Sequence, residues 1–188
     1  PDSGVPAAIG FAEFAHIPFE LGIIRNHYVG RTFIEPEQRI RAFGVKLKHS
    51  ANKGVIKGAR VVLIDDSVVR GTTSMKIVAL LKDAGAREVH MRIASPPITH
   101  PDFYGIDTPS KQELLAANKS IEEMRRYMGA DSLAFISVAG IYRAMGQDRR
   151  DNRNPQFTDH CFTGDYPTPL ADAEAPDIRQ LSLLTETI

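Results

Sequence analysis

The spacing of apolar and polar residues predicts that strands and helices alternate along this chain. Residues 59–65 (ARVVLID) form a continuous apolar run, which is typical of a strand buried on both faces. Residues 74–84 carry apolar side chains at helical spacing, and Gly85 follows as a stop signal. Residues 88–95 (EVHMRIAS) alternate apolar and polar positions, which predicts the next strand.

Weaker patterns complete an α/β arrangement. Helices are predicted over 4–16, 36–42, 110–117 and 120–128 and in a short segment ending near Gly146, and strands over 19–24 and 132–137. Ser120 and Glu123 form a capping-box pattern at one helix start. We therefore expect a mostly parallel sheet with helices on both faces, and ligands in such folds bind outside the carboxyl ends of the strands.

The chain divides into a domain over 1–146 and a tail over 147–188. The tail is rich in Asp, Arg, Asn, Pro and Thr, and we expect it to be loosely structured. Periodicity also fades over 25–57, which predicts a long flexible loop. The opening PDSG turn follows no element, so we expect the domain to lack its amino-terminal part.

Composition narrows the class of protein. The 188 residues are 43% apolar and carry zero net charge, which gives no reason to expect a nucleic-acid or membrane partner. The single cysteine, Cys161, excludes an intrachain disulfide and fits a reducing compartment, so we expect a cytoplasmic protein. Charge is unevenly distributed along the chain, because residues 25–60 contain nine Lys and Arg but only two acidic residues.

The clearest chemistry follows the apolar run at 61–64. Asp65 and Asp66 are adjacent, and two neighbouring carboxylates favour a partner that is cationic or rich in donors. Gly71 then allows close backbone approach, and the hydroxyl-rich start of the next helix offers free N–H groups to a phosphate. Acids and hydroxyls at such turns also serve as helix caps. Together, however, the features suit a phosphorylated ribose, and neither a Walker motif nor G-x-G-x-x-G is present.

This segment resembles the phosphoribosyl pyrophosphate (PRPP) signature of type I phosphoribosyltransferases: an apolar strand, two acids and a loop ending in Gly-Thr-Thr. The segments PDSG, IRNHYVGRTFIEPEQR, IASPPITHPDFYGIDTPS and IEEMRRYMGADSL resemble the amidophosphoribosyltransferase family in particular. The resemblance runs over 1–168 and covers only the carboxyl-terminal part of that family's pattern.

The resemblance implies a pentosyltransferase reaction. A glutaminase domain, absent from this chain, would release ammonia from glutamine, and ammonia would displace pyrophosphate from PRPP to give 5-phosphoribosylamine. This is the first committed step of purine biosynthesis. The family also implies Mg²⁺, a homo-oligomer and inhibition by purine nucleotides.

The resemblance assigns roles residue by residue. It implies PRPP binding by the PDSG turn and the signature: Ser3, Gly4, Asp65, Asp66, Ser67, Val68, Val69, Arg70, Gly71, Thr72, Thr73 and Ser74. Ser3, Asp65 and Asp66 would hold the magnesium. Arg25, Tyr28 and Arg31, on a loop that closes over PRPP, would act near the pyrophosphate.

The chain departs from some members of the family. Those members carry an iron–sulfur cluster on cysteines, but Asp102 stands at one such position and Cys161 is alone, so we predict no cluster and a free core thiol. In the predicted closing loop, His27 stands where Arg is common in the family.

Two alternative functions are a PRPP-binding regulatory protein and a nucleobase phosphoribosyltransferase. The intact YVGRTF segment disfavours the first, and PPITHPDFYGID disfavours the second.

Overall fold

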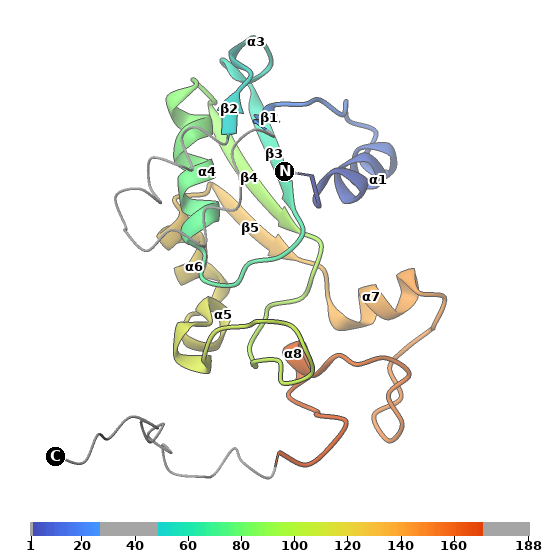
Figure 1. Ribbon diagram of the computed structural model, residues 1–188. Coiled ribbons are helices and arrows are strands. Elements are labelled where there is room, and N and C mark those ends of the chain that lie inside the picture. The colour runs from blue at the N-terminus through green and yellow to red at the C-terminus, as the bar shows by residue number, and fades with distance from the viewer. Residues whose placement is uncertain (1, 27–48, 171–188) are drawn as a thin grey trace, which may run out of the picture.

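A three-stranded parallel sheet organises the part of the chain that the structure describes. The structure is a computed structural model, which describes residues 2–26 and 49–170 (Figure 1). β3 (Arg60–Asp65), β4 (Glu88–Ile93) and β5 (Ser132–Phe135) pair in the order β3-β4-β5. The predicted α/β class with a parallel sheet is therefore confirmed.

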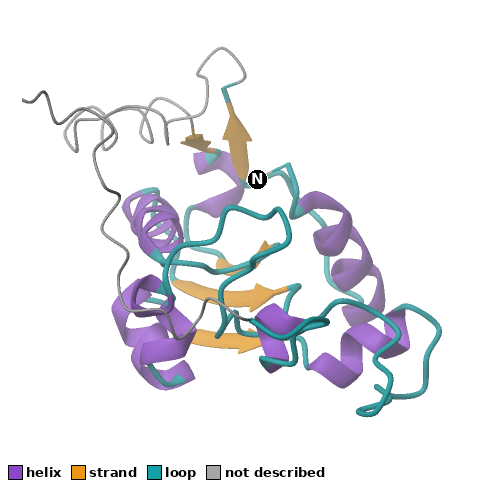
Figure 2. Ribbon diagram, turned by 60° about the horizontal axis from the view of Figure 1, so that its bottom comes forward, coloured by secondary structure: helices purple, strands orange, loops and turns teal. Residues whose placement is uncertain are grey.

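Helices cover both faces of this sheet. α4 (Thr72–Asp83) and α6 (Ile121–Met128) lie on one face, and α1 (Val5–Ala15) and α7 (Val138–Ala144) lie on the other (Figures 1 and 2). The apolar side of α4 packs with that of α6 onto β4, so the core contains Ile77, Val78, Leu81, Val89, Met91, Met124 and Met128. Burying one such side chain contributes roughly 1.5–3 kcal/mol to stability.

Capping signals in the sequence fix several helix ends. The Ser120 hydroxyl accepts from the Glu123 N–H while the Glu123 carboxylate accepts from the Ser120 N–H, so the predicted capping box is confirmed. Gly129 ends α6 in the left-handed conformation, at φ 72°. The shorter elements are α3 (Lys53–Ile56), η2 (Lys111–Glu113), α5 (Leu115–Asn118) and α8 (His160–Thr163).

The strands differ from the sequence prediction in two places. The strand expected over 19–24 is only β1 (Ile23–Arg25), and it pairs antiparallel with β2 (His49–Ala51), which was not predicted. Three-residue strands are too short for a periodic pattern, so their pairing depends on distant residues. β3 is only half-buried along most of its length, because it lies at the edge of the sheet within the described residues.

The segment after residue 146 is more ordered than expected up to Thr168. Its backbone is mostly irregular, but Arg150 forms an ion pair with Asp159 in which both side chains are largely buried. The Tyr166 hydroxyl donates to the Pro101 carbonyl, which ties the segment to the loop after β4. The helix expected over 36–42 lies outside the described residues. Within the described residues, no helix is both long enough and apolar enough to cross a membrane.

Candidate functional site

Two carboxylates stand where β3 ends. Asp65 is the last residue of β3 and is half-buried, whereas Asp66 is exposed in the turn that follows. The Asp66 N–H donates to Asp65 Oδ1 over 3.1 Å. Burial and, next, the neighbouring charge of Asp66 raise the pKa of Asp65 to about 6. The ionised pair is therefore poorly compensated by the described protein, and a cation would favour it.

The loop after the carboxylates presents a row of free backbone donors. Among the described residues, no protein acceptor takes the backbone N–H groups of residues 67–74, and the first helical hydrogen bond of α4 runs from the Met75 N–H to the Gly71 carbonyl. No side chain from residues 2–26 or 49–170 caps the start of α4. Unpaired N–H groups at a helix start, with the positive end of the helix dipole, form an anion site.

Side chains below the loop hold this shape. Val68 is 2% exposed and packs in the core, and the Val69 carbonyl accepts from the Leu115 N–H over 2.9 Å. Gly71 has φ 72°, and a Cβ there would lie 2.5 Å from Leu115 Cδ2. Glycine suits the left-handed backbone, and any larger residue would require the Leu115 side chain to shift. The loop is thus anchored from below while its N–H groups stay available.

The amino-terminal turn packs against the same strand end. A Cβ on Gly4 would lie 3.1 Å from the Ile64 carbonyl oxygen and 3.4 Å from Asp65 Cα, so the PDSG turn touches β3 directly. Ser3 is exposed beside it. Arg25 Nη1, at the end of β1, pairs with Asp2 Oδ2. Residues predicted to serve one site from three parts of the sequence therefore meet at one edge.

The predicted side chains differ in what they offer. Thr72 and Thr73 are exposed at the start of α4, but Ser74 is only 3% exposed. Arg70 pairs with Glu113 over 3.1 Å. Because the side chains of Val68 and Ser74 are buried, these two residues can offer only their backbone N–H groups to a ligand. Tyr28, Arg31 and the rest of the predicted closing loop beyond residue 26 lie outside the described residues.

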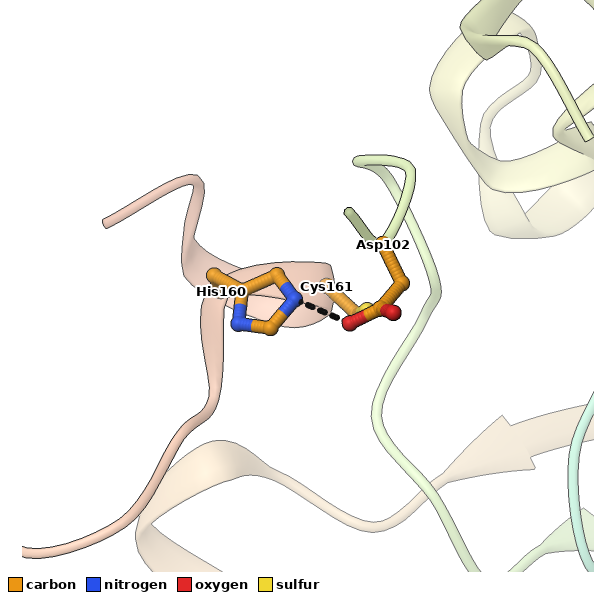
Figure 3. Close-up of side chains that lie close together, drawn as sticks. All are labelled: Asp102, His160 and Cys161. Atoms are coloured by element: carbon orange, nitrogen blue, oxygen red, sulfur yellow. Dashed lines mark hydrogen bonds and ion pairs between the residues drawn. The ribbon is translucent and has the colours of Figure 1, made fainter. Parts of the chain in front are cut away.

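Sequence reasoning missed a second group of chemically active side chains. Asp102, His160 and Cys161 place their potential ligand atoms within 4.8 Å of one another (Figure 3). The sequence identifies Asp102 only as a departure from the family pattern, and Cys161 only as a core thiol. No regular ligand spacing joins Asp102 to His160, which is 58 positions away. The signal that could have found the group is the resemblance itself, which places both Asp102 and Cys161 where cluster-carrying members of the family have cysteines.

Comparison with known proteins gives a consistent result. No protein-family model matches the chain. It is 63% identical over 186 residues to the amidophosphoribosyltransferase of Rhizobium etli, covering 98% of this chain and 38% of that protein. It is 52% identical over 184 residues to the amidophosphoribosyltransferase of Bacillus subtilis, again covering 38% of the relative. Amidophosphoribosyltransferase 2 of Arabidopsis thaliana is 59% identical over 167 residues, which cover 89% of this chain and 29% of the relative.

The fold agrees with the sequence. A solved structure of the glutamine PRPP amidotransferase of B. subtilis, complexed with ADP and GMP, superimposes with a TM-score of 0.80 at 54% identity. The match covers 92% of this chain and 38% of that one. The predicted resemblance is thus confirmed in sequence and in fold, and the chain belongs to the amidophosphoribosyltransferase family, of whose first-named bacterial relatives it spans about 38% of the length.

Proposed function

We propose that this chain forms the PRPP-binding and pentosyl-transfer part of an amidophosphoribosyltransferase. In this proposal ammonia displaces pyrophosphate from C1 of PRPP and yields 5-phosphoribosylamine. A glutaminase domain outside this chain supplies the ammonia from glutamine. The observation that carries the proposal is the Asp65–Asp66 pair followed by eight backbone N–H groups, residues 67–74, with no protein acceptor among the described residues.

The row of N–H groups suits the 5-phosphate of PRPP. A phosphate accepts several hydrogen bonds at once, and the dipole of α4 favours its negative charge. The exposed hydroxyls of Thr72 and Thr73 stand at the same helix start and add donors. Because Val68 and Gly71 fix the loop from below, the phosphate would bind a preformed cradle and little ordering entropy would be lost.

The adjacent carboxylates suit the ribose and a magnesium ion. Asp65 and Asp66 offer only oxygen atoms, which is the ligand type that Mg²⁺ prefers, and the exposed Ser3 hydroxyl is a further oxygen near the same strand end. The raised pKa of Asp65 supports this fit, since a divalent cation relieves the repulsion between the two carboxylates. When bound, Mg²⁺ would offset negative charge that develops on the pyrophosphate.

Basic side chains complete the proposed chemistry. As the C1–O bond breaks, the ribose carbon gains positive charge and the pyrophosphate gains negative charge, so positioning and electrostatic stabilisation suffice without a protein nucleophile. Arg25 lies against Asp2 of the PDSG turn, which places a guanidinium at the turn assigned to the pyrophosphate. Tyr28 and Arg31 are proposed to act there as well, on the strength of the sequence alone.

Regulation and assembly extend the proposal. The solved B. subtilis structure is a complex with ADP and GMP, so nucleotides bind that relative. By analogy we propose that the protein containing this chain is a homo-oligomer inhibited by purine nucleotides. The domain over 1–146 would bind PRPP, and residues 147–188 would follow it as a carboxyl-terminal segment.

The proposal is tested by removing either carboxylate. Asp65→Asn and Asp66→Asn should each weaken binding of Mg-PRPP or turnover by about ten- to a hundredfold, because a charge-assisted hydrogen bond contributes roughly 1.5–3 kcal/mol. Calorimetric titration of PRPP with magnesium present measures binding, and pyrophosphate release measures turnover. Asp83→Asn, at the other end of α4, is the matched control and should behave as the parent protein. Unchanged binding and turnover in both variants would contradict the assignment.

A further inference from the structure

A compact set of three metal-ligand side chains lies outside the proposed PRPP site. Asp102 belongs to the loop after β4, and His160 and Cys161 belong to α8 (Figure 3). Their candidate ligand atoms, one oxygen, one nitrogen and one sulfur, lie within 4.8 Å of one another. We call this set the Asp-His-Cys cluster.

The carboxylate of the cluster is buried and held as an anion. The Asp102 side chain is 3% exposed. Its Oδ2 accepts from the Tyr104 N–H over 2.9 Å and from the Ile106 N–H over 2.7 Å, while Oδ1 faces His160 Nε2 at 2.6 Å. Burial acts to raise the pKa of Asp102, but these hydrogen bonds outweigh it and lower the pKa below its ordinary value. The loop therefore presents a fixed negative oxygen to the imidazole.

The imidazole is fixed in position but has a spare nitrogen. Its ring lies 5.0 Å from the Tyr104 ring and stacks at 5.1 Å on Tyr166, and its side chain is 5% exposed. His160 Nδ1 is buried and has no hydrogen-bond partner in the described part of the chain. With Asp102 as acceptor, Nε2 carries the ring proton. Because no partner fixes Nδ1, the proton can move there and free the Nε2 lone pair for a cation.

The donor set selects the kind of cation. One carboxylate, one imidazole and one thiolate form a mixed O, N and S set that suits a borderline ion such as Zn²⁺, whereas Mg²⁺ and Ca²⁺ prefer oxygen alone. A divalent ion would neutralise the buried Asp102 carboxylate and the half-buried Cys161 thiolate together, which offsets the repulsion between these two neighbouring anions. The Cys161 thiol would release its proton to solvent when its sulfur binds the ion.

We propose that the Asp-His-Cys cluster binds one divalent transition-metal ion of the zinc type, through Asp102 Oδ1, His160 Nε2 and Cys161 Sγ, with the remaining position open to water. The ion would join two segments that already touch. The Thr99 and His100 N–H groups donate to the Cys161 carbonyl over 2.9 and 3.1 Å. The bound metal would therefore stabilise the docking of the carboxyl-terminal segment on the loop after β4.

Cobalt(II) is the direct probe of this proposal, because a cysteine thiolate bound to cobalt gives a charge-transfer absorption band in the near ultraviolet. The chelator-treated protein should bind one equivalent of Co²⁺ with this band, and Zn²⁺ should displace it. Cys161→Ser should lose the band. Asp102→Asn and His160→Gln should weaken cobalt binding by at least about tenfold. Asp107→Asn, in the same loop, and His90→Asn, on the sheet, are matched controls and should keep the parent affinity.

A second measurement needs no variant. Cys161 is the only cysteine, so alkylation of the unmodified protein reports on this thiol alone. Zinc should slow that alkylation and raise the melting temperature of the parent protein and of both controls, but should not raise that of Cys161→Ser. Absence of saturable cobalt binding, or an alkylation rate unchanged by zinc, would overturn the proposal. It would also be overturned if Asp102→Asn and His160→Gln destabilise the metal-free protein yet keep the parent affinity for cobalt.

Discussion

At the scale of single residues, Gly71 carries two constraints that can be separated by experiment. Its φ is 72°, and a Cβ would lie 2.5 Å from Leu115 Cδ2 and 3.2 Å from Tyr127 Cε1. Gly129 has the same φ of 72°, but a Cβ there would meet no atom of the described part of the chain within 4 Å. The pair therefore distinguishes the cost of the left-handed backbone from the cost of the clash.

We expect Gly71→Ala to lower the free energy of unfolding by about 2–4 kcal/mol, the sum of backbone strain and overpacking. Gly129→Ala should lower the free energy of unfolding only by the strain of the left-handed backbone conformation, roughly 1–2 kcal/mol. Urea denaturation of the two variants measures the difference. Equal losses would show that Leu115 and Tyr127 move aside without cost, and the loop would then be less tightly anchored than the structure indicates.

Asp65 predicts a pH dependence of stability in the absence of metal. Its pKa rises from an ordinary 3.8 to about 6 in the folded protein, chiefly through burial and then through Asp66. Between these two values the folded state binds more protons than the unfolded state, so the free energy of unfolding falls as pH rises from about 4 to 6. This unfavourable contribution persists above pH 6, where Asp65 is ionised.

The matching variant is Asp65→Asn, which cannot ionise. In chelator-containing buffer it should lose the decline in stability between pH 4 and 6 and should exceed the parent protein by on the order of 1 kcal/mol at pH 7. Denaturant titrations at several pH values measure this. A parent protein whose stability rises over the same interval would show that Asp65 is not the dominant group. If Asp65→Asn is more stable than the parent protein but binds PRPP more weakly, Asp65 lowers the stability of the fold while serving the binding site.

At the scale of elements, Arg150 braces the carboxyl-terminal segment internally, and its partner Asp159 links that segment to α7 of the domain. Its guanidinium donates to both oxygens of Asp159 over 2.6 and 3.1 Å and to Asp165 Oδ2 over 2.6 Å. Tyr142 of α7 donates to the same Asp159 over 2.9 Å. The Arg150 and Asp159 side chains are 13% and 7% exposed. Removing the cation would leave a buried carboxylate without its charge partner.

Arg150→Ala should therefore lower the free energy of unfolding by about 3–5 kcal/mol. Hydrogen exchange over residues 159–166 should become faster, and the melting temperature should fall. Arg150→Lys keeps the charge but loses the paired hydrogen bonds, so its stability should lie between that of the parent protein and that of Arg150→Ala. The neighbouring exposed Arg149→Ala should change stability by no more than about 0.5 kcal/mol. If Arg150→Ala matches that control, the segment is held by other contacts.

The elements also show where sequence reasoning works. The continuous apolar run of β3 and the helical spacing of α4 depend on local pattern, and both were predicted within a few residues. The Asp65–Asp66 pair and the loop after it could be picked out from the sequence because their residues are contiguous in the chain, and their roles toward phosphate and magnesium stay predictions. The pairing of β1 with β2 and the Asp102–His160 contact depend on residues far apart in sequence, and local pattern carries no information about them. The Arg150 network joins residues 9 and 15 positions apart, but it lies in an irregular segment where no periodic pattern indicates which charges pair.

At the scale of the whole molecule, β3 was predicted to be buried on both faces, but within residues 2–26 and 49–170 it is a half-buried edge strand. A groove of about 150 Å³ runs between α1 and β3, lined by apolar residues that include Val5, Phe11, Val62 and Ile64. An open strand edge presents unpaired N–H and C=O groups, which can pair with a further strand. In the proposed full-length protein, this edge is the place where we expect additional sheet to continue.

The division of labour proposed for the reaction can be tested on the whole chain. Burial, and next the Asp102 charge, raise the pKa of the Cys161 thiol, so little thiolate forms at neutral pH and the chain's only cysteine is a poor nucleophile for glutamine. The groups proposed for transfer from PRPP are nevertheless present. With Mg-PRPP, the chain should release pyrophosphate with ammonium chloride but not with glutamine.

Free NH₃ is the attacking species, so at fixed total ammonium the rate should rise with pH as ammonium deprotonates. Asp65→Asn should reduce this ammonia-dependent rate, while Asp83→Asn should not. Circular dichroism must first establish that the chain is folded, since an open β3 edge promotes aggregation. Glutamine-driven release would contradict the proposed division. A folded chain that binds Mg-PRPP but does not react with ammonia would contradict the claim that this chain holds the whole transfer site. The anion cradle after β3 would then bind PRPP, and the rest of the protein would supply the groups that bring it to reaction.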